Sequence, residues 1–286
     1  MLCKNPYMSY AVPYPCGQCN PCRINRRRVW THRIVLESLK HERNSFLTLT
    51  YADEHLPEGG TLVPRDVQLW LKRFRKAIYP LSLRYFFVGE YGDRTFRPHY
   101  HAALFGVGIE FSSLVSSTWS KGHVFLGDLN LQSAQYIAGY VVKKMTSSND
   151  SRLDGRHPEF SRMSLRPGIG AFAMRDVAKV FDTDVGHRYI HENFDVPMSL
   201  KHGGRSLPLG RYLRRKLREE MGFVNVGGQP EAIYQQSQKM CQMYSDAFSS
   251  SEGSSLSLKQ IVVDSFEGQV LSMEARAKIY SKKGVL

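Results

Sequence analysis

The sequence predicts an α+β fold in which helices flank a mainly antiparallel central sheet. Over residues 23–145, helical and strand-like segments follow one another in the order α-β-α-β-β-α-β-α. The two consecutive strand-like segments are joined by about eight residues, which is short enough for an antiparallel hairpin. Helices interspersed among paired strands form the layered packing of α+β domains.

The first half of this pattern contains two helices and a strand. Apolar residues recur at helical spacing over residues 23–42, which are otherwise strongly basic. Residues 45–51, SFLTLTY, alternate and are rich in β-forming side chains, so we expect a strand there. A second helix is expected over residues 63–80, with Pro64 near its first position and Pro80 at its end.

The second half supplies the remaining strands and two more helices. Residues 83–90 and 99–106 are largely apolar and of strand length, so we expect buried strands. A short helix over 111–120, a strand over 122–129 and a helix over 132–145 complete the pattern.

Composition divides the chain into three regions. Residues 1–44 form a cysteine-rich, basic arm and helix, and residues 45–150 form the α+β core. The sequence then becomes polar and opens an accessory region, 151–286, in which a Ser-rich stretch near 249–257 is expected to be a flexible linker.

The chain is strongly basic. Its 39 Lys and Arg against 26 Asp and Glu give a formal net charge of +13, which favours a polyanionic partner, most simply nucleic acid. Residues 1–45 alone hold eight Lys or Arg and two Glu. Arg26, Arg27 and Arg28 are the expected phosphate contacts, although a solvated basic face would have the same composition.

Nothing in the sequence indicates export or membrane insertion. It has no run of 18 apolar residues, so we expect no membrane contact. Its first residues lack the apolar core of a signal peptide. We therefore expect the five cysteines to stay reduced in a cytoplasm, as thiols or metal ligands.

Two histidines lie one residue apart in the stretch RPHYHAALFG. Because side chains at i and i+2 of a strand point to the same face, His99 and His101 would form a pair of metal ligands. Two ordinary polar residues on a solvated strand face are the alternative. Glu90 would lie across the hairpin as the third ligand, with Asp53 and Glu54 as competitors.

Two tyrosines lie four residues apart in the stretch YIAGYVVKK. Tyr136 and Tyr140 would therefore share one face of the helix expected there. A tyrosine hydroxyl acts as a covalent nucleophile once its proton is removed or its developing charge is offset. Lys143 and Lys144 fall close to the same face and would offset that charge or hold a phosphate. The alternative is that the tyrosines pack the helix onto the sheet.

The N-terminal arm carries a CxxCxxC run with a further cysteine upstream. Its four cysteines are Cys3, Cys16, Cys19 and Cys22. Four thiolates are the ligand set of a structural zinc site. Three alone would need another ligand, for which His32 and His41 are candidates. Reduced structural thiols in a turn-rich arm are the alternative.

Together, these motifs resemble those of the HUH endonucleases, which include rolling-circle replication initiators and relaxases. FLTLTY, the HYH pair and the tyrosine helix are similar to the family's three motifs in order and spacing, and two tyrosines separated by three residues resemble its two-tyrosine class. CGQCNPCRINRRRVW, GEYG, RPHYHAALFG and RMSLRPGIG are similar to segments of the replication initiators of microviruses, especially the gokushovirus-like branch. The resemblance covers residues 16–170, and Tyr100 is bulkier than the aliphatic middle residue usual in the family.

The resemblance implies a ferredoxin/RRM-like HUH nuclease core that nicks and joins DNA. Mg²⁺ or Mn²⁺, held by the histidine pair and Glu90, would bind the scissile phosphate. Tyr136 or Tyr140 would attack it, leaving a 5′-phosphotyrosine and a free 3′-OH, and so start and end rolling-circle replication of a small single-stranded DNA phage.

The resemblance also implies the partners of the chain. Single-stranded or extruded origin DNA would be contacted by Arg97 and the three N-terminal arginines, and host helicase and polymerase would act with the chain in the bacterial cytoplasm. Two other functions stay open: a non-catalytic protein that binds single-stranded nucleic acid, and a metal-dependent hydrolase without a covalent step. Only the nicking and joining enzyme predicts a covalent protein–DNA adduct.

Overall fold

The computed structural model describes most of the chain, namely residues 2–9, 12–93, 95–142, 147–202, 204–250 and 256–282. The chain divides into two compact units. One, here called the sheet unit, is Trp30–Ala173. The other, here called the terminal unit, joins Met1–Val29 to Met174–Leu286.

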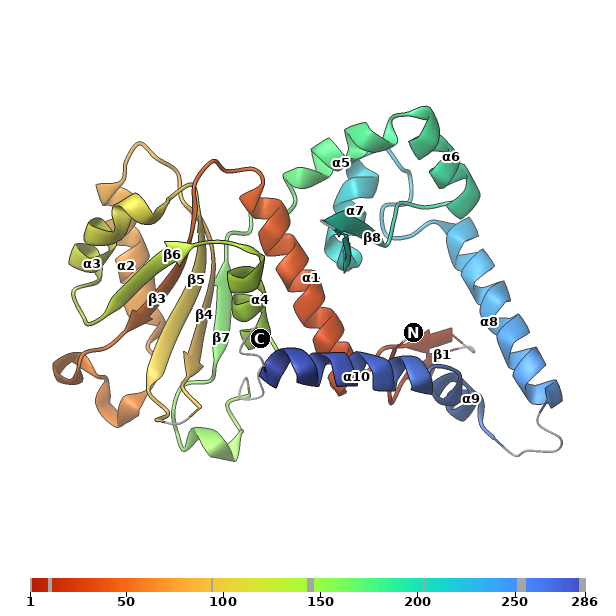
Figure 1. Ribbon diagram of the computed structural model, residues 1–286, viewed down its shortest axis with the longest axis horizontal. Helices are drawn as coiled ribbons and strands as arrows, with labels where there is room; N and C mark the ends of the chain where they lie inside the picture. Colours follow the sequence, from red (N-terminus) through yellow and green to blue (C-terminus); the bar gives the residue numbers. More distant parts are fainter. Residues whose placement is uncertain are drawn as a thin grey trace. The chain divides into compact units, whose positions relative to one another are not determined.

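The sheet unit is built on five strands in the order β6-β3-β5-β4-β7, and every neighbouring pair is antiparallel (Figure 1). The strands are β3 (Asn44–Thr50), β4 (Arg84–Tyr91), β5 (Pro98–Phe105), β6 (Val124–Asp128) and β7 (Phe160–Met163). β4 and β5 form the predicted hairpin, and β5 lies at the centre of the sheet.

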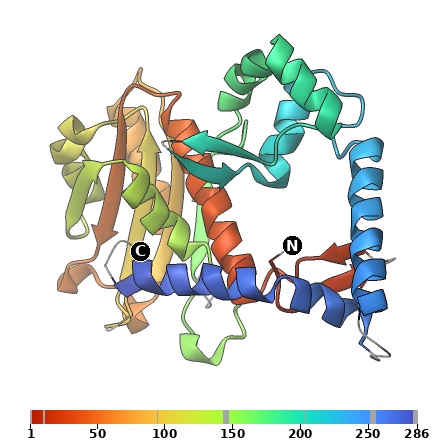
Figure 2. The same cartoon turned by 45° about the vertical axis from the view of Figure 1, so that its right-hand side comes forward.

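Helices cover both faces of this sheet (Figures 1 and 2). α2 (Pro64–Ala77) and α3 (Ser112–Trp119) pack on the face that carries Tyr100. α1 (Asn20–Ser38) and α4 (Leu131–Tyr140) contribute apolar side chains to the core on the opposite face. The predicted α+β class, with a mainly antiparallel sheet flanked by helices, is therefore confirmed.

The register of β5 against its neighbours positions the two histidines. His99 lies opposite Glu90 of β4 and Thr50 of β3, and His101 lies opposite Thr48 of β3. Because directly opposed residues share a face and side chains alternate along each strand, these five side chains all belong to one face. It is the face covered by α1 and α4, since the later residues of β5 with the same alternation pack there.

Three segments differ from the predicted ones. α1 ends at Ser38 rather than at residue 42, because Asn44 Nδ2 donates to the carbonyl oxygens of Ser38 and His41 and so satisfies the end of the helix. α4 ends at Tyr140, and residues 143–146 lie outside the described residues. β7 was not predicted, because four residues are too few to display a strand periodicity.

The remaining elements lie in loops of the sheet unit and in the terminal unit. The single-turn 3₁₀ helices are η1 (Asp53–His55), η2 (Glu58–Gly60), η3 (Ile109–Phe111) and η4 (Ser151–Leu153). The other strands are β1 (Tyr7–Ser9), β2 (Val12–Tyr14), β8 (Ser199–His202) and β9 (Arg205–Pro208). The other helices are α5 (Ala173–Phe181), α6 (Asp184–Asn193), α7 (Gly210–Glu220), α8 (Pro230–Ser250), α9 (Leu258–Ser265) and α10 (Glu267–Lys282).

The terminal unit has a small apolar core of its own. Tyr244 of α8 and the pair Ile261 and Val262 of α9 are buried together, and Met8 of β1 packs against them. The two ends of the sequence therefore contribute to one cluster. Within the part of the chain that is described, no helix combines the length and apolarity needed to cross a bilayer.

Candidate functional site

β5 presents the two predicted histidines side by side. The rings of His99 and His101 are nearly parallel, with centroids 6.4 Å apart and an interplanar angle of 5°. His101 is buried, whereas His99 is half-buried. The i, i+2 spacing therefore brings the pair to one face of the strand, as predicted.

His101 is held by hydrogen bonds at both ring nitrogens. Its Nε2 lies 3.1 Å from Oε1 of the buried Glu90, and its Nδ1 lies 2.9 Å from Oγ1 of Thr48. Thr48 was not singled out from the sequence. The alternation of SFLTLTY indicates which residues share its face, but only the register of β3 against β5 shows that Thr48 faces His101.

Of the three carboxylates considered as a third ligand, Glu90 is the one that contacts the histidine pair. Asp53 is highly exposed in η1 and forms an ion pair with Arg97, whose Nη1 lies 2.7 Å from Asp53 Oδ1. Arg97 Nη2 also donates to the carbonyl oxygen of Tyr51 at 2.9 Å. Glu54 lies in the same 3₁₀ helix, which has no buried residue.

The tyrosine helix brings both hydroxyl-bearing rings to His101. α4 begins with a capping box between Asn130 and Ser133, which fixes its first turn. Tyr140 stacks on the His101 imidazole with centroids 4.9 Å apart and an interplanar angle of 12°. Tyr136 meets the same imidazole edge-on at 5.2 Å, and the two tyrosine rings lie 5.0 Å apart.

The two tyrosines differ in environment. Tyr136 is 39% exposed, while Tyr140 is half-buried. Burial raises the pKa of the Tyr140 hydroxyl far above its usual value, and the negative charge of Glu90 raises it further. Tyr140 therefore needs help to ionise. The lysines expected to provide it, Lys143 and Lys144, lie outside the described residues.

The donor set at the histidines fits a divalent ion. Burial lowers the pKa of His99, although Glu90 opposes the shift, so its imidazole is neutral and able to act as a ligand. His99 Nδ1 is buried and has no hydrogen-bond partner among the described residues. Two imidazoles and a carboxylate suit a divalent ion with open positions. Within the described chain their donor atoms do not converge within 4.8 Å, so the set is more open than a closed metal cage.

Tyr100, between the two histidines, has a structural role on the opposite face. Its hydroxyl accepts a hydrogen bond from the Val63 N–H at 2.8 Å and lies 3.0 Å from the Tyr51 hydroxyl. Tyr51 in turn donates to Asp66 of α2 at 2.8 Å. The bulky middle residue of HYH thus fastens β5 to the start of α2.

In the terminal unit, the four cysteines of the N-terminal arm lie together. Their sulfur atoms are all within 4.8 Å of one another, and among the described residues they are the one group of three or more His, Cys, Asp or Glu that converges in this way. This cluster can hold a metal ion. The alternative ligands are placed elsewhere: His32 is buried within α1, and His41 Nε2 lies 3.5 Å from Glu37.

The N-terminal arginines are not equally available. Arg26 is exposed, but Arg28 Nη2 donates to the carbonyl oxygen of Ser206 at 2.8 Å. Arg27 is half-buried, and burial lowers the pKa of its guanidinium. Arg26 is therefore the member of the trio best placed to meet a phosphate.

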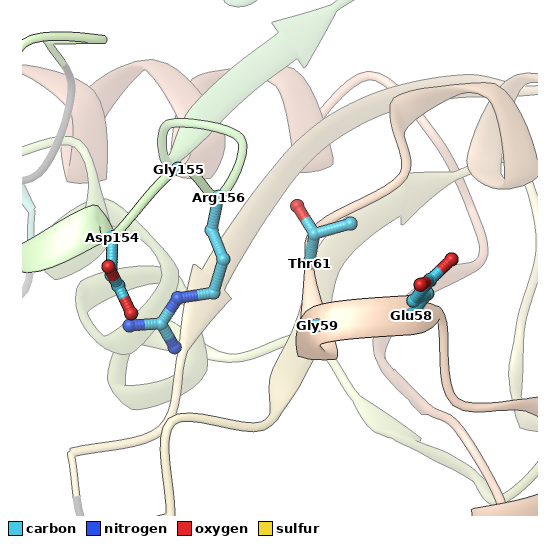
Figure 3. A pocket seen from close by; sticks show the side chains of 6 residues that line it. All are labelled: Glu58, Gly59, Thr61, Asp154, Gly155 and Arg156. Carbon is cyan, nitrogen blue, oxygen red and sulfur yellow. The ribbon is translucent and has the colours of Figure 1, made fainter.

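A separate pocket of about 540 Å³ lies in the sheet unit between η2 and the turn after η4 (Figure 3). In Figure 3, the side chains of Asp154 and Arg156 lie beside one another, across from Thr61. None of its lining residues belongs to the histidine–tyrosine site.

The α+β core is consistent with the nuclease core of the HUH class, which is the first level at which the chain is identified. Residues 44–146, from the start of β3 to beyond α4, match the family model of the replication-associated protein ORF2. No solved structure gives a significant match.

Three phage proteins are similar to the chain. The replication-associated protein VP4 of Bdellovibrio phage phiMH2K is 36% identical over 167 residues, which are 51% of this chain and 52% of that protein. The replication-associated protein ORF2 of Spiroplasma virus 4 is 28% identical over 240 residues, 76% of this chain and 71% of that protein. ORF4 of Chlamydia phage 1 is 28% identical over 164 residues, 49% of this chain and 41% of that protein. The chain thus spans about half of the Bdellovibrio phage protein, and the resemblance to microvirus replication initiators is confirmed.

Proposed function

We propose that the chain is a metal-dependent endonuclease that nicks and rejoins DNA to start and end the rolling-circle replication of a small single-stranded DNA phage. The observation that carries this proposal is the contact of Tyr136 and Tyr140 with His101, whose Nε2 is hydrogen-bonded to Glu90. Two nucleophile-type side chains and a metal-type donor set on one sheet face are what such a reaction requires. The names of the similar phage proteins support the role in replication.

The divalent ion would be held by His99, His101 and Glu90. When bound, Mg²⁺ or Mn²⁺ supplies positive charge that polarises the scissile phosphate. Thr48 positions the His101 ring through Nδ1 and fixes which nitrogen is free for the site. The open donor set leaves room for phosphate oxygens.

The tyrosine hydroxyls act as nucleophiles. In the first step, a tyrosine oxygen forms a bond to phosphorus, the bond from phosphorus to the 3′ oxygen breaks, and the hydroxyl proton is released. The products are a 5′-phosphotyrosine and a free 3′-OH, which primes a host polymerase. Rejoining reverses these bonds without another energy source, because the phosphotyrosine ester preserves the energy of the phosphodiester. The second tyrosine cuts the regenerated origin, so that the released 3′-OH closes a circle.

The substrate and partners follow from this chemistry. Single-stranded or extruded origin DNA supplies a phosphate that can reach the sheet face, and the net charge of +13 favours its binding. Host helicase and polymerase, in the cytoplasm of a bacterial host, provide strand separation and synthesis.

One experiment separates the three functions considered. Single-stranded oligonucleotides that tile the genome encoding the chain are labelled at the 3′ end and incubated with the full chain and Mn²⁺. The nicking and joining enzyme transfers the label to a protein band that survives boiling in detergent. A hydrolase yields shortened DNA with no labelled protein, and a non-catalytic binding protein leaves the DNA intact. Either of these last two results would reject the proposal.

A further inference from the structure

The sulfur atoms of the N-terminal cysteines have the spacing of a tetrahedral metal site. Cys16 Sγ lies 4.0 Å from Cys22 Sγ, and Cys19 Sγ lies 3.8 Å from Cys3 Sγ. Zinc–sulfur bonds of about 2.3 Å in a tetrahedron give sulfur–sulfur edges of about 3.8 Å. A disulfide would need about 2.05 Å, and all four cysteines are free. The spacing therefore matches four thiolates around one ion rather than two disulfides.

Backbone N–H groups surround these sulfurs. Cys16 Sγ accepts from the N–H groups of Gln18 at 3.4 Å and Cys19 at 3.3 Å. Cys3 Sγ accepts from the Cys16 N–H at 3.3 Å, and Cys19 Sγ from the Lys4 N–H at 3.5 Å. Such donors stabilise negative charge on sulfur and orient metal ligands. They favour thiolates over neutral thiols at this position.

The backbone conformation that creates this arrangement is local and specific. Gly17 has φ of +74°, a left-handed conformation that lets Cys16 and Cys19 turn their sulfurs to the same side. Cys22 lies in the first turn of α1, whose N-terminal end carries partial positive charge. The loop and the helix start thus both favour a negatively charged thiolate cluster.

We propose that Cys3, Cys16, Cys19 and Cys22 bind one structural zinc ion, which ties the N-terminal arm to the C-terminal helix α10. On binding, thiol protons leave as zinc–sulfur bonds form, with no change in oxidation state. Four protein ligands complete the tetrahedron and leave no open position, so the site is structural rather than catalytic.

The residues next to the ligands make the connection to α10. Lys4, which follows Cys3, forms an ion pair with Glu274 at 2.8 Å. Asn20, which follows Cys19, donates from Nδ2 to the same carboxylate at 3.3 Å. Because an exposed ion pair contributes little alone, the contact depends on how firmly both neighbours are held. Zinc binding would fix both positions and so stabilise the seat of α10.

Metal analysis of the intact chain tests zinc binding. Protein prepared with zinc under reducing conditions should retain one zinc per chain after dialysis, and Cys241→Ser should retain the same amount, because Cys241 is exposed in α8 and outside the cluster. Cys16→Ser should lose the zinc. Wild-type protein gives a second readout without mutation: zinc should slow alkylation of the four cluster cysteines and leave Cys241 reactive. Absence of zinc, or equal alkylation of all five with and without zinc, would reject the site.

Hydrogen exchange tests the tie to α10. Removing zinc with a chelator should speed exchange over residues 267–282 and leave β5 unchanged. Glu274→Gln should speed exchange over the same residues while keeping one zinc per chain. If the metal-free chain protects α10 as well as the zinc-loaded chain does, the tie is wrong. Because neither readout involves DNA cleavage, failure here is distinguishable from failure of the proposed endonuclease function.

Discussion

The ring of Tyr140 stacks on the imidazole of His101, with centroids 4.9 Å apart and planes inclined by 12°. These residues come from different elements, α4 and β5, and the contact brings a possible nucleophile to a possible metal ligand. The second nucleophile candidate, Tyr136, touches the same imidazole but is more exposed. The chemistry proposed for the chain therefore centres on His101.

Substitution of the histidine pair should abolish cleavage and spare binding. We expect His99→Ala and His101→Ala each to lower the rate of adduct formation by about 10²–10³-fold, the effect of losing one group that stabilises transition-state charge. Their affinity for single-stranded DNA should change little, because phosphate contacts are spread over many basic residues. Rate and affinity are measured with the same labelled oligonucleotide.

Glu90 and Asp53 provide a matched comparison of carboxylates in this assay. Glu90→Gln should lower cleavage strongly, because Glu90 contacts His101. Asp53→Asn should lower it little, because Asp53 is exposed and pairs with Arg97. A larger loss with Asp53→Asn would show that the third ligand is not Glu90.

Thr48 should act as a positioning residue for His101. Thr48→Val keeps the shape of the side chain but removes the hydrogen bond to Nδ1, so we expect cleavage to fall by about 10- to 100-fold. The metal concentration for half-maximal activity should rise as well, a change that a general loss of folding would not produce. Thr50→Val, on the same face of β3, is the control and should leave both values near wild type. Equal effects of the two variants would remove the role of Thr48.

Glu37 should stabilise the sheet unit in a pH-dependent way. It is fully buried, bonds to Arg84, and accepts from the Gly170 N–H at 2.6 Å. Burial opposes the shift, but contacts with His41, Arg84 and this N–H lower its pKa. Breaking such a buried pair costs about 3 kcal/mol in the free energy of unfolding, which we expect for Glu37→Gln.

The pH dependence of that difference follows from the lowered pKa. The stabilisation from Glu37 is fully present above the unfolded-state pKa of about 4.3 and is lost as the pH falls through the lower folded-state value. Urea unfolding at several pH values should therefore show the gap between wild type and Glu37→Gln constant near neutrality and narrowing in acid. A gap that widens in acid would contradict the assignment.

Arg26 should contribute one phosphate contact to DNA binding. Arg26→Ala should make the slope of log affinity against log salt shallower by about 0.7, the change expected for one contact to single-stranded DNA. Arg175→Ala, at an exposed arginine of α5 that pairs with Glu220, is the charge-matched control. Equal changes in slope for both would indicate a general effect of net charge.

Most of the α+β core could be predicted from the sequence because its signals are periodic. Strands β3 to β5 follow alternation or apolar runs, and α2 follows a helical stripe between two prolines. The spacing of the histidines and of the tyrosines indicated which residues share a face of each element. The resemblance to microvirus initiators added the class of nuclease core.

What the sequence lacked was register. Whether Thr48 or Thr50 faces His101 depends on how β3 pairs with β5, and a shift of pairing changes every contact without altering the pattern. The ion pair of Asp53 with Arg97 is likewise a tertiary contact. So is the bond from Arg28 to Ser206, which joins residues 178 positions apart. These contacts decide which of several equally plausible residues belongs to the site.

The central claim is that a tyrosine of α4 forms the covalent link to DNA, and peptide mapping of the adduct by mass spectrometry tests it most directly. The wild-type chain should carry the nucleotide mainly on the more exposed Tyr136, with a minor fraction on Tyr140. Tyr136→Phe should lower first-strand cleavage about tenfold more than Tyr140→Phe, a difference of about 1.4 kcal/mol in activation free energy. The double Phe variant should bind DNA and form no adduct. An adduct on any other residue, or any adduct in the double variant, would contradict the account.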